Sequence, residues 1–242
     1  MTTLLEVRNL IRTFGALNAV AGVSFSVRQG ELVGLIGPNG AGKSTLYNLI
    51  AGAIAPTSGE VAFKDRPVGG WKPYQAARAG VARTFQIPKP YRHLSVLENV
   101  ALSAMLHDRS VAAACESAQA ILADVGLADY VDAPVGNLTV GLLKRLEVAR
   151  ALALRPSLVL FDEIMAGLTP SEVKGMTSLV AGLPARGITV IWVEHVLYAI
   201  MSTAQRIVVL NRGEVIADGP PAKVSKDPAV IKAYLGEEMS GV

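Results

Sequence analysis

The 242-residue sequence predicts an α/β fold with a single helical interruption. Strand-like apolar runs alternate with helical segments through most of the chain, which is the pattern of a sheet covered by helices. Between about residues 89 and 155 the strand signal is lost and helical periodicity replaces it. A glycine-rich loop at 37–42 also separates an apolar run from a helical one. We therefore expect a sheet-based core that carries an inserted helical lobe.

The first third of the chain is expected to form short strands around one helix. This helix is placed at 46–51, directly after the glycine-rich loop. A strand that begins at Val81 is expected to end at Gln86. The other early strands are expected at 4–9, 20–27, 31–36 and 59–63.

Helix-start and turn signals organise the remainder. The segment Ser95–Glu98 has a capping-box pattern and begins a helix of the lobe. A later helix begins at Thr169, which is followed by a proline at the first helical position and an acid at the third. The turn Asn211-Arg212-Gly213 predicts a hairpin between the last two strands. Strands are expected at 157–161, 188–193, 205–210 and 214–217.

The hydrophobic content is high, but its distribution is that of a buried core. Hydrophobic residues make up 51% of the chain, yet no run approaches the ~18 apolar residues of a spanning helix. The richest run, 188–193, stops at Glu194 and is interpreted as a buried parallel strand. The first six residues lack a charged start, so no signal peptide is expected. The only cysteine, Cys115, excludes an intrachain disulfide and a cysteine metal cluster and is expected as a small helix residue. We expect an intracellular protein.

The charge pattern gives no sign of a nucleic-acid partner. The 23 basic and 20 acidic residues leave a net charge of +3, and the basic residues are scattered. Lys144-Arg145 is about the densest pair, and no run of five or six like charges marks a nucleic-acid arm. A mildly positive surface is compatible with both phosphate ligands and anionic membranes, so the charge does not distinguish between these partners.

The glycine-rich loop and the residues after it have the pattern G-x-x-x-x-G-K-S, which is the P-loop pattern. Its glycines let backbone N–H groups and the helix N-terminus point at phosphate oxygens. Lys43 would reach the β- and γ-phosphates, and the Ser44 hydroxyl would hold Mg²⁺. The alternative is a glycine-rich turn without a ligand. The expected phosphate cradle consists of Gly37, Pro38, Asn39, Gly40, Ala41, Gly42, Lys43, Ser44 and Thr45.

Two acids end the apolar strand Leu158–Phe161. The carboxyl ends of parallel strands form the ligand-binding edge of an open sheet, so Asp162 and Glu163 are expected beside the P-loop. Asp162 would steady Mg²⁺ through water, and Glu163 would orient the water that attacks the γ-phosphate. The alternative is an ordinary acidic turn. Together with the P-loop, the pair predicts hydrolysis of a nucleoside triphosphate.

These motifs give the chain a resemblance to the ATP-binding subunits of ABC transporters over nearly its whole length. The P-loop, Gln86, the Asp162-Glu163 pair and His195 occur in that family's order and approximate spacing. The resemblance implies that Phe14 places its ring against adenine and that His195 touches the γ-phosphate. It implies that Gln86 links Mg²⁺ and the attacking water to the helical lobe. Taken singly, Phe14 could be a core residue, Gln86 a loop amide and His195 a helix-start residue.

The resemblance also implies the details of the fold. It is the ABC ATPase form of the P-loop NTPase fold: a mixed sheet core with an antiparallel β subdomain and an inserted α-helical lobe. The chain is expected to be one ATP-binding domain over 1–242. Its nucleotide-binding core would comprise residues 1–88 and 156–242, and its helical lobe residues 89–155.

The segment at 138–142 departs from the family's signature, L-S-G-G-Q. Thr139 keeps a hydroxyl and Gly141 keeps the second glycine, whereas Val140 and Leu142 replace a glycine and the glutamine. In the family this segment contacts the γ-phosphate bound to the other subunit, so Thr139 and Gly141 are expected to bind nucleotide there. In the arrangement called the ATP sandwich, ATP is held between the P-loop of one subunit and the signature segment of the other. The departures affect the strength of that sandwich. Ile164 is a further departure, since a proline commonly follows the glutamate.

The resemblance implies several partners. We expect a head-to-tail dimer with a second ATPase subunit, either identical or similar, because each site needs a signature from another subunit. Integral membrane permease subunits would insert a short helix against residues 86–99, and an extracytoplasmic substrate-binding protein would act through them. The chain would then lie peripherally on the cytoplasmic face of the cell membrane.

Four segments resemble the ATPases of branched-chain amino-acid importers: 83–88, 94–100, 166–170 and 233–237. The transported substrate stays open, with urea, short amides and aromatic acids as alternatives. The ATPase of the lipopolysaccharide exporter is a rival within the family. Rivals outside transport are a soluble ABC-type ATPase, such as an iron–sulfur assembly factor, and a P-loop small-molecule kinase. The kinase predicts neither a signature helix nor a histidine after the next strand.

Overall fold

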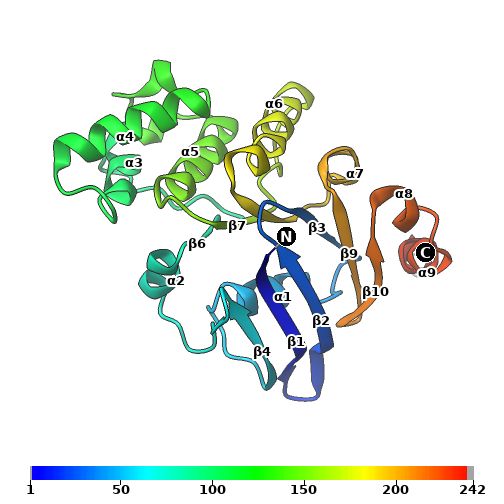
Figure 1. Ribbon diagram of the computed structural model, residues 1–242. Coiled ribbons are helices and arrows are strands. Elements are labelled where there is room, and N and C mark those ends of the chain that lie inside the picture. The colour runs from blue at the N-terminus through cyan, green and yellow to red at the C-terminus, as the bar shows by residue number, and fades with distance from the viewer. Residues whose placement is uncertain (1, 239–242) are drawn as a thin grey trace.

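The computed structural model describes residues 2–238, with the backbone alone described for 235–238. Two sheets form the core, and a group of helices extends from one side of it (Figure 1). The first sheet is antiparallel, with the strand order β2-β1-β4-β5. Its strands are β1 (Thr3–Phe14), β2 (Leu17–Arg28), β4 (Ser58–Phe63) and β5 (Arg66–Pro67).

The second sheet is mixed and has the order β10-β9-β3-β8-β7-β6. All of its strand pairs are parallel except β9–β10, which is the predicted hairpin. The predicted mixed sheet with an antiparallel subdomain is therefore confirmed. The strands are β3 (Leu32–Ile36), β6 (Val81–Arg83), β7 (Leu158–Asp162), β8 (Thr189–Val193), β9 (Arg206–Asn211) and β10 (Glu214–Gly219).

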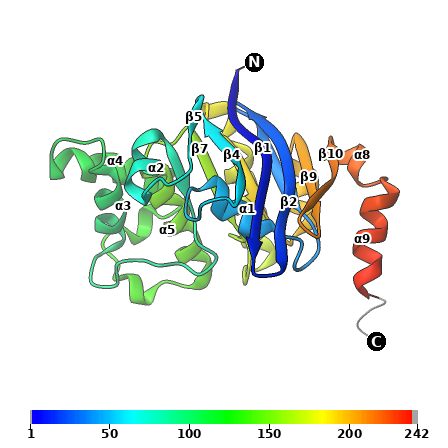
Figure 2. The same cartoon turned by 90° about the horizontal axis from the view of Figure 1, so that it is seen from below.

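Three successive helices, α3, α4 and α5, gather between β6 and β7 on one side of the molecule, and α9 stands at the opposite end (Figures 1 and 2). Their position is that of the expected inserted lobe, whose limits at 89 and 155 stay a prediction. The helices are α1 (Lys43–Ile50), α2 (Pro73–Ala79), α3 (Val96–Ala104), α4 (Val111–Asp124), α5 (Val140–Ala153), α6 (Pro170–Ala181), α7 (Leu197–Thr203), α8 (Pro221–Val224) and α9 (Pro228–Glu238). Single 3₁₀ turns lie at Ala128–Tyr130, Val135–Asn137 and Pro184–Arg186.

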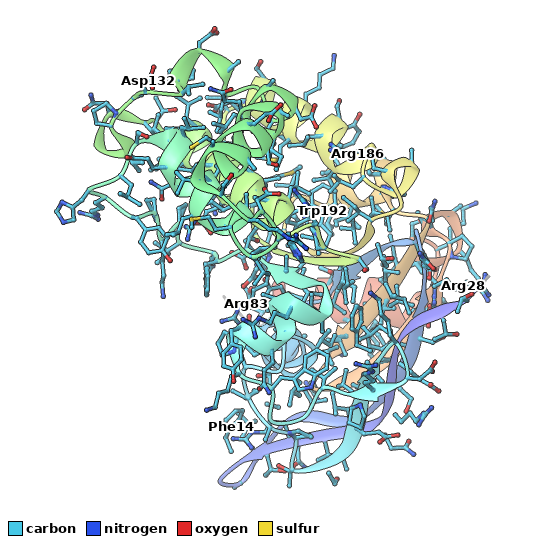
Figure 3. All side chains as sticks on the ribbon, turned by 60° about the vertical axis from the view of Figure 1, so that its left-hand side comes forward. Phe14, Arg28, Arg83, Asp132, Arg186 and Trp192 are labelled. Atoms are coloured by element: carbon cyan, nitrogen blue, oxygen red, sulfur yellow. The ribbon has the colours of Figure 1, made fainter. Side chains whose placement is uncertain are left out.

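The mixed sheet is covered on both faces. Successive side chains of a strand point to opposite faces, and in β7 they divide between two hydrophobic clusters. Leu158 and Leu160 pack with α1 and the antiparallel sheet, whereas Val159 and Phe161 pack with the helices of the lobe and α6. β8 is buried at every residue, which confirms the buried parallel strand expected there. Trp192 of β8 lies in the middle of the molecule (Figure 3).

Most local signals correspond to the observed elements. Ser95 and Thr169 cap α3 and α6 with complete capping boxes. Cys115 lies half-buried on α4, as expected. α2 and β5 were not predicted; α2 is short and buries only Ala76, so it has no apolar periodicity to detect. No helix in the described part of the chain is long and apolar enough to cross a bilayer.

A buried tyrosine fixes the helix after the P-loop to the sheet. The Tyr47 hydroxyl lies 2.7 Å from the carbonyl oxygen of Thr84 and 3.0 Å from that of Leu160. Burial raises its pKa above the ordinary range, so it stays a neutral donor. Thr84 in turn accepts a hydrogen bond from the Asp162 backbone N–H through its Oγ1. One hydroxyl thus holds α1 against the ends of β6 and β7.

Candidate nucleotide-binding site

The P-loop runs from buried β3 into α1 and packs against neighbouring strands by backbone contact. Gly37 and Gly42 have φ values of 152° and 97°. A Cβ on Gly37 would lie 2.1 Å from the Leu210 carbonyl oxygen, and one on Gly42 would lie 2.1 Å from that of Ala19. Only glycine allows this approach at these two positions.

The β9–β10 turn braces the same loop. The Gly213 N–H donates to the Ala41 carbonyl at 3.0 Å, and the Gly213 carbonyl accepts from the Ala21 N–H at 2.8 Å. The turn therefore hydrogen-bonds both the P-loop and β2. The hairpin was predicted from its turn residues, but its contact with the P-loop was not.

Lys43 is held over the centre of the loop. Its side chain is buried, with 7% exposed, and its Nζ donates to the carbonyls of Gly37 at 2.7 Å and Pro38 at 2.8 Å. The first turn of α1 contains no acidic residue that would offset the positive end of the helix dipole. A lysine ammonium and an open helix N-terminus together make a site for phosphate oxygens.

A pocket of about 550 Å³ connects the P-loop with residues from the strand ends. Its volume lies in the range of small-molecule sites. The structure brings Lys43, Glu163 and His195 together at this pocket, along with most of the predicted phosphate cradle. Leu17, Asn18, Ala19 and Arg212 also line it and were not predicted. The full lining is Leu17, Asn18, Ala19, Asn39, Gly40, Ala41, Gly42, Lys43, Ser44, Thr45, Glu163, His195 and Arg212.

Glu163 is the meeting point of three strand ends. Its Oε1 lies 2.7 Å from His195 Nε2, and its Oε2 accepts a hydrogen bond from Gln86 Nε2 at 2.5 Å. Its backbone has a φ of 47°, a left-handed conformation that is uncommon for a residue with a side chain. The Glu163 N–H donates to the Val193 carbonyl at 2.9 Å. Both carboxylate oxygens therefore have partners, Gln86 and His195, that the family resemblance had also identified.

Asp162 lies next to Glu163 at the end of β7. Burial raises the pKa of its carboxyl, and the neighbouring Glu163 raises it further. A bound cation would favour its charged form, so this carboxyl suits a place beside Mg²⁺. No group of three or more His, Cys, Asp or Glu side chains within residues 2–238 would hold a metal by itself.

The other predicted site residues lie away from the pocket lining. Phe14 is half exposed at the end of the antiparallel sheet (Figure 3), with the Arg12 guanidinium 4.5 Å from its ring centre. Thr139 caps α5 by accepting from the Leu142 N–H at 3.4 Å. A Cβ on Gly141 would lie 2.0 Å from Glu172 Oε1, so α5 and α6 approach closely there.

Two buried charged residues behind Glu163 were not predicted as site residues. Lys144 Nζ donates to the backbone carbonyls of Gln86 and Glu163. Glu194 accepts from the N–H groups of Met165 and His195, and burial raises the pKa of its carboxyl. The only sequence signal was a charge next to a buried strand or in the helix that follows the signature segment, which does not indicate what the charge contacts.

Comparison with known proteins assigns the family. The ABC transporter family matches residues 20–166, which is more than half of the chain. The chain belongs to the ABC transporter family. As an ABC ATPase it binds and hydrolyses ATP. A second family, the branched-chain amino acid ATP-binding cassette transporter, matches residues 214–239.

Curated ABC relatives align over nearly the full length. The chain is 36% identical to the high-affinity branched-chain amino acid transport ATP-binding protein BraF of Pseudomonas aeruginosa, covering 97% of this chain and 98% of BraF. It is 32% identical to the lipopolysaccharide export system ATP-binding protein LptB of Acidithiobacillus ferridurans, covering 98% of this chain and 99% of LptB.

Solved ABC cassettes share the fold. The ADP conformation of MJ1267, an ATP-binding cassette of an ABC transporter, superposes with a TM-score of 0.88 at 32% identity, over 98% of this chain and all of that one. The cassette MJ0796, solved as a dimer bound to ADP and Pi, has a TM-score of 0.81 at 26% identity, over 90% of this chain and 99% of that one.

The close packing of the P-loop predicts different costs for two glycine substitutions. Gly37→Ala should lower the free energy of unfolding by about 3 kcal/mol or more, because its Cβ would overlap the Leu210 carbonyl. Gly40→Ala is the matched control: it also has a positive φ of 73°, but its Cβ would meet open space. It should cost about 1 kcal/mol, from backbone strain alone. Urea denaturation measures both, and equal costs would contradict the described packing of the loop.

Proposed function

We propose that the chain is an ATPase subunit that powers import of branched-chain or related amino acids. The observation that carries this proposal is the match of residues 214–239 to the branched-chain amino acid cassette family, together with full-length similarity to BraF. The pocket that holds Lys43, Glu163 and His195 supplies the ATPase chemistry for this role.

The proposed roles begin with the phosphates. Backbone N–H groups of the P-loop and Lys43 would hold the β- and γ-phosphates. Mg²⁺ prefers oxygen ligands, and it is usually held by few protein groups together with the phosphates of the substrate. Ser44 Oγ, the amide oxygen of Gln86 and, through water, Asp162 fit that preference. When bound, Mg²⁺ would neutralise charge on the phosphate oxygens.

Glu163 is the proposed catalytic residue. A carboxylate on the pocket wall can orient the water and accept its proton as the water attacks the γ-phosphate. His195 lies beside one oxygen of that carboxylate, and Gln86 bonds the other. His195 would fix the orientation of the carboxylate and contact the γ-phosphate. Gln86 connects the same carboxylate to the loop that leads into the helical lobe.

The second half of the site is proposed to come from another subunit. Thr139 and Gly141 belong to the start of α5 and do not line the pocket beside their own P-loop. A head-to-tail dimer, with an identical or similar ATPase subunit, would bring the start of α5 to the partner's nucleotide. The dimeric structure of the cassette MJ0796 supports a dimer of ATPase subunits. Val140 is half exposed at the helix start, where the signature usually has glycine.

Glu163→Gln should keep ATP binding and trap the closed dimer, because the amide orients water without accepting its proton. Size exclusion with Mg-ATP should show a dimer for the variant, whereas the same variant with ADP is the control and should stay monomeric. A variant that remains monomeric with ATP even after addition of the second ATPase subunit would contradict the proposed sandwich.

A groove at the junction of core and lobe is the proposed docking site for the membrane subunits. A cavity of about 260 Å³ lies between α2, β6 and α5 and is lined partly by Phe85 and Arg150. Beside it, Ile87 is 74% exposed and Tyr91 is 49% exposed, with Arg150 5.0 Å from the Tyr91 ring centre. Internal packing of the lobe does not account for these two apolar side chains. They suit a short helix of a permease subunit.

The loop beside this groove is held in place by a buried asparagine. Asn99 is fully buried and bonds the backbone N–H and carbonyl of Tyr91 and the carbonyls of Leu94 and Ser95. The docking surface is therefore pre-organised by one side chain of α3. Permease docking would hold the chain peripherally at the cytoplasmic face of the cell membrane, with a substrate-binding protein acting through the permeases.

Lipopolysaccharide export is the second candidate function, favoured by the 32% identity to LptB over nearly the whole chain. If the chain were a soluble ABC-type ATPase, the exposed side chains of Ile87 and Tyr91 would have no membrane subunit to contact. Family membership and the presence of α5 and His195 argue against a small-molecule kinase.

A tagged pull-down from detergent-solubilised membranes, with ATP and vanadate, tests the transport role. We expect two permease subunits and a second ATPase. Ile87→Asp should lose the permeases and keep basal ATPase activity, because its exposed side chain does not line the nucleotide pocket. The control is Val111→Asp, which is exposed on α4. Recovery of soluble proteins alone would contradict the importer, and recovery of an exporter's subunits would favour the second candidate.

A further inference from the structure

A buried lysine joins the signature helix to both loops that hold the catalytic carboxylate. The Lys144 side chain is 2% exposed, and its Nζ donates to the Gln86 carbonyl at 2.5 Å and the Glu163 carbonyl at 2.9 Å. These carbonyls follow the neighbouring parallel strands β6 and β7. One ammonium group from α5 therefore holds the backbone at two strand ends.

The environment of Lys144 explains how the charge is kept in the interior. Burial lowers the pKa of the ammonium, while the carboxylates of Glu194, Glu163, Asp162 and Glu147 oppose that shift. Buried charges persist where they are paired and hydrogen-bonded. An apolar side chain at this position would remove the lysine bond from both carbonyls and leave the Glu163 carbonyl with only the longer bond from the Ala166 N–H at 3.3 Å.

The two carbonyls belong to residues whose side chains also contact each other. Gln86 Nε2 donates to the Glu163 carboxylate, so Lys144 closes a triangle of backbone and side-chain bonds. Glu163 has the left-handed φ of 47°, and its carbonyl accepts the Lys144 bond at 2.9 Å and a longer one from the Ala166 N–H at 3.3 Å. A shift of Lys144 would therefore redirect the Glu163 backbone and the carboxylate that it carries.

Lys144 also lies one helical turn from the start of α5, where Thr139 caps the helix. A helix moves as a rigid body over such a distance, so a displacement of its N-terminus reaches Nζ with little loss. In the dimer proposed above, that N-terminus faces the nucleotide of the partner subunit.

We propose that Lys144 is a positioning residue that sets the place of Glu163 when α5 docks on the nucleotide of the partner subunit. This inference rests on the proposed ATP sandwich. It gives a physical reason why hydrolysis in one subunit depends on closure of the dimer. Docking would displace α5, and Lys144 would transfer that displacement to the backbone of Glu163 and Gln86. Lys144 does not line the pocket beside the P-loop.

Three variants of the full chain, in the assembly in which it is isolated, test this role. Lys144→Met has a similar length and no N–H donors, Lys144→Arg keeps donors, and Lys174→Met removes an exposed lysine of α6 as the control. Lys144→Met should lower kcat by about tenfold to a hundredfold while the equilibrium affinity for Mg-ATP changes by less than about twofold. Lys144→Arg should recover most of kcat, and Lys174→Met should match the wild type.

A second readout separates positioning from simple support of the fold. In a Glu163→Gln background, Lys144→Met should still form the ATP-dependent closed dimer, because Thr139 and Gly141 remain in place. Loss of that closure, unchanged kcat in Lys144→Met, or a fall in ATP affinity equal to the fall in kcat would each overturn the inference. If Lys144→Met does not fold, Lys144→Ala, which also lacks N–H donors, replaces it with the same expectations. A wild-type assembly without ATPase activity would overturn the proposed function, whereas an active one with an indifferent Lys144→Met would overturn only this inference.

Discussion

The site depends on how closely the P-loop backbone approaches the strands around it. Gly37 and Gly42 lie against carbonyl oxygens of β9 and β2 with no room for a side chain. The Gly213 turn then adds a hydrogen bond to Ala41. A loop supported in this way keeps its N–H groups in position before any ligand arrives, and pre-organised donors are what stabilises developing charge most effectively.

The second constraint is the attachment of Glu163. Its N–H, carbonyl and both carboxylate oxygens bond to groups from β8, α5, the Gln86 loop and His195. The left-handed backbone at this position costs free energy that these bonds offset. Elements that are far apart in the chain therefore meet at one residue. A change at any of them, such as the proposed docking of a permease near Ile87 or of a partner-bound nucleotide at Thr139, would reach the carboxylate that we propose as catalytic.

The sequence predicted the parts of this arrangement that depend on neighbouring residues. The P-loop has a fixed local spacing, β8 is a continuous apolar run, and the caps at Ser95 and Thr169 depend on residues three positions apart. The same local information placed Asp162 and Glu163 at the ligand-binding edge of the sheet, because the carboxyl ends of parallel strands share one edge, whereas His195 was placed by the resemblance.

Contacts between distant segments were not predictable in the same way. Lys144 is 58 residues from Gln86 in the chain, and Arg212 is far from the P-loop, so no local pattern connects them. α2 was not predicted because a helix with a single buried alanine shows no apolar periodicity in the sequence. Phe14 was placed by resemblance, and in the structure it borders the Arg12 guanidinium instead of the pocket lining. Its contact with adenine stays a prediction.

The most direct measurement is the equilibrium affinity of Lys43→Ala for Mg-ATP, beside the wild type and an exposed control, Lys174→Ala. If the braced P-loop is the phosphate site, the loss of charge-assisted contacts of roughly 1.5–3 kcal/mol should weaken binding by about tenfold to a hundredfold or more. Lys174→Ala should bind as the wild type does. Unchanged affinity in a folded Lys43→Ala would contradict the assignment of this loop as the nucleotide site, and with it the roles of Glu163 and His195.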